Sequence, residues 1–267
     1  MKRVYISVDI EGITDVIDWN ETELGHSTHA AAAQQMTAEA AAACRGALAA
    51  GADEVWVRDA HDSARNIDAA KLPKGVRLIR GWECTENSMM EEIDRGFDCA
   101  VCIGYHSKAG SNANPLAHTI NASKMAEIRL NGETVSELEL NAYIAAQYNV
   151  PVVFVSGDQG ICETAEKCIP GVSTVAVKEG VGEAAINIHP QDAVEKIEAG
   201  VKKAVETMTA KCPALPARFD LELCYKQHAS AFKAGRYPGA KQTGPYSAAY
   251  SSDNLKDMLI ARMFMMS

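Results

Sequence analysis

Short apolar runs alternate along the chain with longer segments of helical composition. Apolar runs of about four to eight residues bounded by turn signals are typical of buried strands, whereas longer stretches rich in Ala, Glu, Gln and Lys favour helices. The predicted strands cover residues 3–6, 54–59, 76–79, 99–104, 151–156 and 173–178. The predicted helices cover residues 27–50, 86–95, 161–168, 190–209 and 253–266, and a further one begins at Ser136.

The order of these elements indicates the fold class. Strands alternate with helices through the first two thirds of the chain, and several strands are apolar on both faces, which favours a three-layer α/β domain with a mainly parallel sheet. Residues 118–121 and 125–130 are predicted as short strands, and Asn131-Gly132 is a strong hairpin-turn signal. We expect an α/β metal-binding catalytic domain over 1–212 with a hairpin insertion at 117–135. A C-terminal strand–helix addition over 213–267 is a separate subdomain or part of the same unit.

Composition narrows the classes of partner. The chain has 267 residues, 47% of them hydrophobic, and a net charge of -9. It has no dense basic tract, so nucleic acid and anionic membrane surfaces are not expected partners. Its apolar stretches are far shorter than the ~20 residues that span a bilayer. The first residues lack the apolar core of a signal peptide, so we expect a cytoplasmic protein.

The cysteines do not suggest a disulfide framework. The eight cysteines are scattered along the chain. Cys99 and Cys102 have the spacing of a metal or redox pair, but they lie inside a predicted buried strand. Residues three apart on a strand face opposite sides of the sheet, so we expect two core cysteines instead.

Acidic residues and histidines follow three of the predicted strands. Asp9 and Glu11 end the first strand, and because they are two positions apart they lie on the same side of it. Two such carboxylates repel each other unless a cation lies between them. His61 and His106 follow two later strands. Because functional groups gather outside the carboxyl ends of strands in open α/β sheets, we expect these four side chains to meet at one edge. Gly12 permits a tight turn and a close backbone approach there.

Glu137 is a fifth candidate ligand. Ser136 and Glu139 fit a helix capping box, which leaves Glu137 free to point elsewhere. Carboxylate and imidazole ligands without thiolate suit a catalytic Zn²⁺ site, with Mn²⁺ and Co²⁺ as alternatives. Five ligands are too many for one open zinc site, but they fit two metals ~3.5–4 Å apart that share one carboxylate. We expect that bridge to be Asp9, the shorter acid and the nearer to the strand.

Several segments together resemble the DppA-type zinc D-aminopeptidase family. Their order and approximate spacing match from residue 3 to about residue 180, whereas the last 60 or so residues carry no usable motif. Each segment is weak alone, and the combination is specific. The matching segments are Ser7-Val-Asp-Ile-Glu-Gly12, Asp59-Ala-His61-Asp-Ser63, Gly104-Tyr-His106, His118-Thr119 and Ser136-Glu137-Leu-Glu-Leu-Asn-Ala-Tyr143.

The resemblance implies a cofactor and an assembly. It implies two Zn²⁺ per chain, with Asp9 as the bridge. Glu11 and His106 would hold one ion, and His61 and Glu137 the other. It also implies a likeness to ring-shaped homodecamers that enclose their sites.

The resemblance further implies that His118 is the catalytic histidine. The expected function is therefore a zinc-dependent aminopeptidase that hydrolyses N-terminal residues, D-amino acids by resemblance, from short peptides through a metal-bound hydroxide. His118 would move protons or stabilise the tetrahedral oxyanion.

Two other classes of function share part of this pattern. A dinuclear phosphoesterase, or an amidase of other specificity, would use similar ligands; against the phosphoesterase, no phosphate-cradling Gly-rich loop or Arg cluster lies near the motifs. A non-enzymatic protein that binds a small molecule or a metal would need only a pocket, and it would leave His118 without a role.

Overall fold

The computed structural model describes residues 1–267, and its central element is a seven-stranded sheet. The strands of this sheet are β1 (Arg3–Val8), β2 (Glu54–Asp59), β3 (Arg77–Ile79), β4 (Cys99–Tyr105), β7 (Val152–Asp158), β8 (Ser173–Val181) and β9 (Ala184–Asn187). Their order is β3-β2-β1-β4-β7-β8-β9, and all neighbours are parallel except β8 and β9. The mainly parallel sheet predicted from the apolar runs is confirmed.

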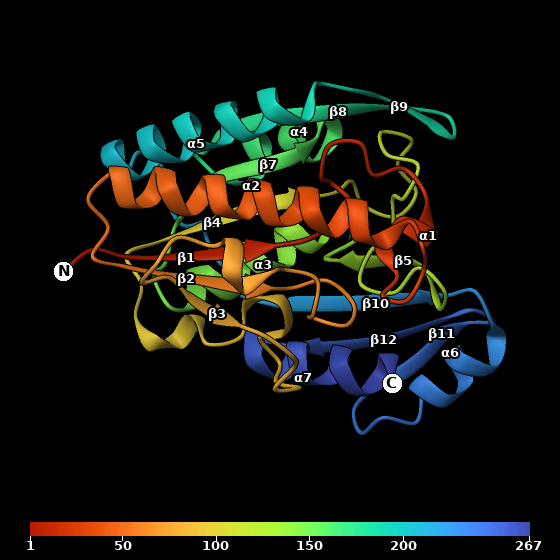
Figure 1. The fold of residues 1–267 in the computed structure, drawn as a ribbon. Helices are drawn as coiled ribbons and strands as arrows, with labels where there is room; N and C mark the ends of the chain where they lie inside the picture. Colours follow the sequence, from red (N-terminus) through yellow and green to blue (C-terminus); the bar gives the residue numbers. More distant parts are fainter.

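The second sheet has five antiparallel strands (Figure 1). They are β5 (Met125–Leu130), β6 (Glu133–Thr134), β10 (Phe219–Tyr225), β11 (Lys241–Gly244) and β12 (Ser247–Ser252), in the order β11-β12-β10-β5-β6. The predicted hairpin therefore pairs with the C-terminal strands and forms one sheet with them. The domain boundary at 212/213 stays a prediction.

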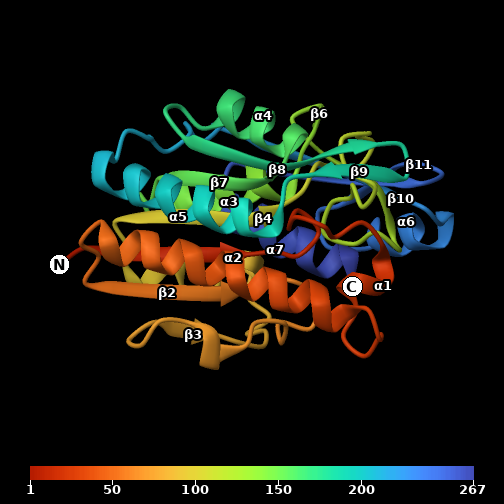
Figure 2. The same cartoon turned by 45° about the horizontal axis from the view of Figure 1, so that its top comes forward.

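Helices cover both faces of the parallel sheet. The helices of the chain are α1 (Trp19–Thr22), α2 (His29–Ala49), α3 (Glu137–Gln147), α4 (Gln159–Cys168), α5 (Pro190–Thr207), α6 (His228–Ala234) and α7 (Leu255–Met266). Helices α6 and α7 pack on the second sheet. Helices α2 and α5 lie side by side on one face, and α3 and α4 pack in the core on the other (Figures 1 and 2). The three-layer α/β architecture is thus confirmed. None of the helices is long and apolar enough to cross a membrane.

Successive side chains of a strand point to opposite faces of the sheet, and this divides the hydrophobic core into two parts. Val4 and Ile6 in β1 pack with the core under α2 and α5, whereas Tyr5 packs with the core shared by α3 and the second sheet. Cys99 and Cys102 follow the same rule in β4, because one belongs to each core and both are free thiols. Two core cysteines were expected from their spacing, and this is confirmed.

Helix α7 packs mainly on its own chain. Met258, Leu259 and Met265 are buried in the core that also holds Tyr5. Phe264 is 56% exposed. Most of the apolar side chains of this helix are therefore used within the protomer, and Phe264 is its large outward-facing side chain.

Residues 86–95 do not form the predicted helix. Two short 3₁₀ turns, Ser88–Met90 and Ile93–Arg95, stand there instead. Glu92 between them has a left-handed backbone, with φ of 71°. The neighbouring Glu91 carboxylate is buried and accepts backbone hydrogen bonds from Glu83 and Thr85, which folds this segment back on itself and prevents a continuous helix.

Residues 118–121 are not the predicted strand. Ile120 has a left-handed backbone, with φ of 65°, and its N–H donates to the Glu137 carboxylate at 2.6 Å. A β-branched residue in this conformation is held there by its surroundings. The segment is therefore a loop that belongs to the candidate site.

Gly12 allows the turn after β1 to lie against β4. A Cβ atom at this position would lie 1.8 Å from the carbonyl oxygen of Tyr105, and one at Gly157 would lie 1.9 Å from the same oxygen. No side chain larger than hydrogen fits either place. The close backbone approach expected for Gly12 is thus present.

Helix α2 supports this turn through a buried carboxylate. One oxygen of Glu39 accepts hydrogen bonds from the Thr14 N–H at 3.2 Å and from Gln35 at 3.1 Å, and the other oxygen has no partner. Burial raises the pKa of Glu39 to about 7. Above the ordinary glutamate pKa the folded chain keeps a proton that the unfolded chain has lost. Stability is therefore lost as pH rises from about 4.5 to about 7.

We predict that Glu39→Gln removes this pH dependence. The amide keeps the acceptor oxygen for Thr14 and has no charge to bury. The variant should be more stable than the wild type at pH 8 by roughly 1–3 kcal/mol, and this advantage should shrink towards pH 4.5. Urea unfolding at a series of pH values measures the effect. The exposed Glu195→Gln is the control, and an equal gain at all pH values would contradict the assignment.

Candidate functional site

The candidate site lies at the carboxyl edge of the parallel sheet. In the sheet register Val8 of β1 pairs with Asp59 of β2 and with Ile103 of β4. The residues just beyond these strands therefore meet at one place. The structure brings together all six residues predicted for the site, which are Asp9, Glu11, His61, His106, His118 and Glu137.

Asp9 lies between two histidines. Its Oδ1 is 3.2 Å from His61 Nδ1, and its Oδ2 is 3.5 Å from His106 Nε2. Glu11 Oε2 is 3.0 Å from His61 Nδ1, and Glu137 Oε1 is 3.4 Å from His106 Nε2. Three groups of possible metal ligands result, and Asp9 belongs to two of them. They are Asp9, Glu11 and His61; Asp9, His106 and Glu137; and Glu11, His106 and His118.

Glu11 belongs to two of these groups, one with His61 and one with His106. Because β1 ends at Val8, Glu11 lies in a turn and not on the strand. The turn is closed by a hydrogen bond from Gly12 to the Gly104 carbonyl, and it brings the two oxygens of Glu11 near His61 and His118. The ligand pairing implied by the family resemblance stays a prediction.

A backbone carbonyl orients each of the three histidines. His61 Nε2 lies 2.9 Å from the Thr22 oxygen, His106 Nδ1 lies 3.0 Å from the Ser107 oxygen, and His118 Nδ1 lies 2.9 Å from the Leu116 oxygen. A carbonyl only accepts, so the nitrogen facing it carries the proton. In a neutral imidazole the other nitrogen then presents its lone pair to the carboxylates, as a metal ligand does.

The loop that carries His61 is fixed by Asp59 at the end of β2. The Asp59 carboxylate accepts from the N–H groups of Asn66 at 2.6 Å and Ile67 at 2.8 Å. The Asn66 side-chain N–H in turn donates to the His61 carbonyl at 2.9 Å, and its Oδ1 accepts from His29 Nε2 at 3.0 Å. The position of His61 is thus fixed by a network of buried hydrogen bonds between Asp59, Asn66 and its own carbonyl.

Glu137 is the first residue of α3. The predicted capping box is present, with Ser136 and Glu139 bonded to each other's backbone N–H. Glu137 is 4% exposed and points towards His106, while its Oε1 also accepts from the Ile120 N–H. Capping therefore leaves Glu137 available to the site, as the sequence predicted.

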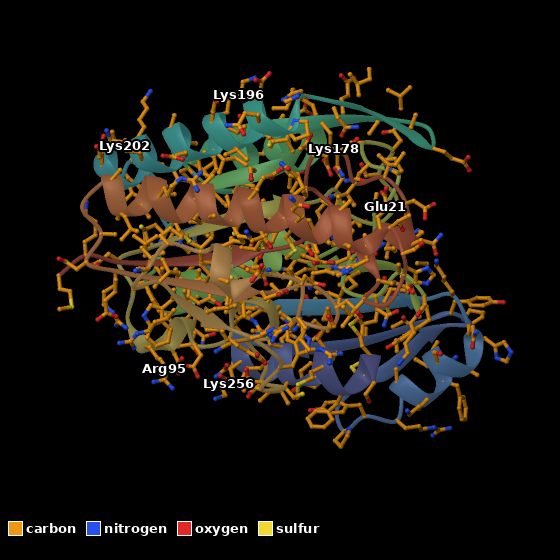
Figure 3. All side chains as sticks on the ribbon, viewed as in Figure 1. Glu21, Arg95, Lys178, Lys196, Lys202 and Lys256 are labelled. Carbon is orange, nitrogen blue, oxygen red and sulfur yellow. The ribbon has the colours of Figure 1, made fainter.

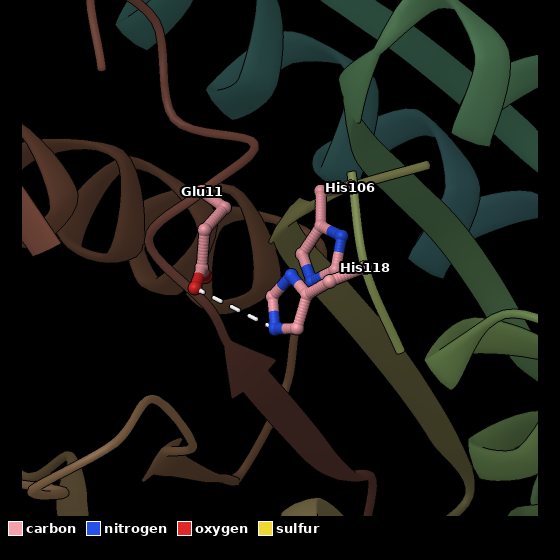
Figure 4. A group of neighbouring side chains, drawn as sticks. All are labelled: Glu11, His106 and His118. Carbon is pink, nitrogen blue, oxygen red and sulfur yellow. Dashed lines mark ion pairs between the residues drawn. The ribbon is translucent and has the colours of Figure 1, made fainter. Parts of the chain in front are cut away.

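His118 stacks on His106 (Figure 4). The ring centroids are 4.3 Å apart and the rings are nearly parallel, at 7°. His118 Nε2 lies 3.6 Å from Glu137 Oε1 and 3.9 Å from Glu11 Oε1. Burial and the neighbouring His106 lower the pKa of His118, which favours a neutral imidazole.

Burial dominates the electrostatics of Asp9. Burial, and then the charge of Glu11, raise the pKa of Asp9 to about 8. For His106, burial works against the charged ring, but the Glu137 carboxylate outweighs it and the pKa of His106 rises to about 10. The site therefore favours positive charge between its carboxylates.

Three buried atoms of the site lack a hydrogen-bond partner. They are Asp9 Oδ2, Glu11 Oε2 and His106 Nε2. All are of ligand type, and each belongs to a group whose ligand atoms lie within 4.8 Å of one another. Buried polar atoms left without a partner are costly unless a cation satisfies them. The donor set of oxygen and imidazole nitrogen thus fits divalent metal ions.

A pocket of about 700 Å³ opens onto these residues. Trp19 and Trp82 line it and are 39% and 37% exposed. Trp19 packs edge-on against His118, with ring centroids 5.2 Å apart. Neither tryptophan can be recognised as a site residue from the sequence, because neither lies in a recognisable motif or at a strand end.

Comparison with known proteins identifies the family. Residues 1–265 match the sequence pattern of the D-aminopeptidase peptidases. The chain belongs to the D-aminopeptidase family. The curated D-aminopeptidase of Bacillus subtilis (strain 168) is 31% identical over 267 residues, which are 99% of this chain and 95% of that protein.

A solved structure shares the whole fold of this family member. It is the Zn-dependent D-aminopeptidase DppA from Bacillus subtilis, a self-compartmentalizing protease, with a TM-score of 0.92 and 29% identity. The match covers 98% of this chain and 96% of that one. The family resemblance and the aminopeptidase class predicted from the sequence motifs are confirmed.

Proposed function

We propose that this D-aminopeptidase family member is a zinc enzyme that removes D-amino acids from the N-termini of short peptides. The observation that carries the proposal is the arrangement of two ligand groups around one carboxylate, with Asp9 Oδ1 facing His61 and Asp9 Oδ2 facing His106. Its relatives are D-aminopeptidases, and the one of known structure is Zn-dependent. Both facts support zinc as the metal and D-amino acids as the residues removed.

Two Zn²⁺ per chain are part of the proposal. Asp9 would bridge the two ions, and Glu11, His61, His106 and Glu137 would supply the other ligands. Zinc in such a site supplies a Lewis acid for the scissile carbonyl and lowers the pKa of water. The carbonyls of Thr22 and Ser107 keep His61 and His106 in the tautomers that coordination needs.

The charge of the pocket suits a free amino terminus. Its lining includes the acidic residues Glu23 and Asp62 beside the site carboxylates, and it includes no Lys or Arg. A cationic ammonium group is therefore attracted to the pocket. Phosphate sites commonly supply a cationic Arg or Lys, and the lining of this pocket has neither. This argues against the phosphoesterase alternative.

His118 would transfer the proton that the reaction moves. Its Nδ1–H is donated to the Leu116 carbonyl, so Nε2 presents a lone pair towards the pocket. The lowered pKa of His118 keeps that nitrogen free near neutral pH. Nε2 would accept a proton from the attacking water and return it to the leaving amine.

The reaction is tested with matched D- and L-aminoacyl p-nitroanilides in the presence of zinc. We predict hydrolysis of the D-substrates at rates at least tenfold above those of the L-substrates. Removal of zinc with a chelator should abolish both activities, and re-addition should restore them. Equal rates for both enantiomers would contradict the stereochemical claim, and chelator-resistant hydrolysis would contradict the metal claim.

The metal count is tested by elemental analysis. We predict about two zinc ions per chain in metal-replete protein, following the two-metal template. Asp9→Ala should lose both ions, because the Asp9 carboxylate would bridge them. The exposed Asp192→Ala on α5 is the control and should keep both. A folded Asp9→Ala protein with two tightly bound ions would show that Asp9 is not the bridge.

The role of His118 is tested with His118→Ala. The five other residues complete the ligand groups, so we predict that the variant keeps its fold and both zinc ions. Its kcat should fall by about 10²–10⁴-fold, the range for a positioned acid or base. The exposed His228→Ala serves as the control. Wild-type turnover would make His118 structural, and loss of metal would make it a ligand.

Homo-oligomeric assembly, as a decameric ring by resemblance, completes the proposal. The relative of known structure is self-compartmentalizing. Phe232, Tyr246 and Phe264 expose 54%, 52% and 56% of their surface around the second sheet, where they are available for contacts between copies. Light scattering should give a mass near ten times that of the chain. A monomer mass of 28.6 kDa at micromolar concentration would contradict the assembly.

A further inference from the structure

A buried carboxylate behind the site has no part in the reaction described above. Asp158 is the last residue of β7 and the N-cap of α4, and it is fully buried. It lies at the same carboxyl edge of the sheet as Asp9, because β7 is the parallel neighbour of β4. It belongs to none of the three ligand groups.

Every bond of Asp158 goes to a segment of the site edge. Its Oδ2 accepts from the Ser107 N–H at 2.7 Å and from the Asn114 amide at 2.9 Å. Its Oδ1 accepts from the Ser107 hydroxyl and from the Ile161 N–H. A carboxylate with four such partners is fully satisfied, and it fixes Ser107 at two points.

Two of the three residues that donate to Asp158, Ser107 and Asn114, also hold residues of the site. The Ser107 carbonyl accepts from His106 Nδ1 at 3.0 Å and so selects the tautomer of that histidine. The Asn114 amide donates to the Glu11 carbonyl at 3.0 Å. The Asp158 carboxylate is therefore linked by two successive hydrogen bonds to His106 and by two others to Glu11.

Asn114 also extends the network to His118. Its side-chain oxygen accepts from the Leu116 N–H at 2.9 Å, and the Leu116 carbonyl accepts from His118 Nδ1. The orientation of His118 thus depends on the loop that Asn114 holds. The link to His106 is shorter, because only Ser107 intervenes.

Lys178 gives Glu11 a second support that His106 does not have. Asp158 and Lys178 are partners in the register of β7 and β8. Lys178 is 3% exposed and donates to the carbonyls of Glu11 and Val16. Lys178 lies in β8, whereas Lys196 and Lys202 are exposed residues of α5 (Figure 3).

We infer that Asp158 is a positioning residue that orients His106 through Ser107 and His118 through Asn114. The inference rests on the proposed function, since it assigns His106 to a zinc ion. It predicts that losing Asp158 weakens the ion held by His106 more than the other ion. Outer partners of metal ligands typically change metal affinity by about 10–100-fold.

The test measures zinc affinity by competition with a chromophoric chelator, on metal-stripped wild type, Asp158→Asn and Ser107→Ala. Asp158→Asn keeps the size of the side chain but removes its charge and two of its acceptor sites. Ser107→Ala removes one bond to Asp158 and leaves the carbonyl that faces His106. A structural control is Ala165→Gly, which weakens α4 without touching this network.

The expected result is that one of two zinc ions binds about 10–100-fold more weakly in Asp158→Asn, and less markedly so in Ser107→Ala. At saturating zinc, kcat should still fall by about tenfold with an unchanged KM, because His118 is misplaced. The Ala165→Gly control should match the wild type in both measurements, although its thermal midpoint falls.

Three outcomes would overturn the positioning role. They are wild-type affinity for both ions in folded Asp158→Asn, an equal weakening in Ala165→Gly, and, if Asp158→Asn does not fold, wild-type zinc affinity in Ser107→Ala. Failure of the proposed function looks different, because the wild type itself would then fail to bind two zinc ions or to hydrolyse the D-substrate.

Discussion

Burial of three carboxylates at one point is the constraint on which the structure depends. Asp9, Glu11 and Glu137 are each less than 5% exposed and lie close enough to share ligand groups. Charges in such a place are tolerated only when cations or strong donors compensate them. The surrounding elements supply this compensation through His61 and His106, and the same arrangement makes a binding site for metal ions.

Much of this arrangement could be predicted from the sequence, because it follows from local signals and one topological rule. The apolar runs located β1, β2 and β4, and parallel strands must end at the same edge. Asp9, His61 and His106 follow those strands directly, so their meeting could be derived without any long-range information. Glu137 was found because the capping box accounted for its neighbour Glu139 and not for Glu137 itself.

Other features could not be predicted because they depend on backbone groups distant in sequence. The position of Glu11 near both His61 and His118 comes from the turn against β4, which a strand pattern does not describe. The stacking of His118 on His106 depends on the loop at residues 118–121, for which the hydrophobic pattern predicts a strand. Asp158 ended a predicted strand, but its partners Ser107 and Asn114 carry no periodic signal.

The shared sheet of the hairpin and the C-terminal strands sets the order in which the site is completed during synthesis. The ribosome delivers the parallel strands β1, β2 and β4 early, and with them four of the six site residues. His118 and Glu137 flank the hairpin β5–β6, whose partner β10 is made much later. In a nascent chain the hairpin between His118 and Glu137 therefore has no partner strand until β10 has been made.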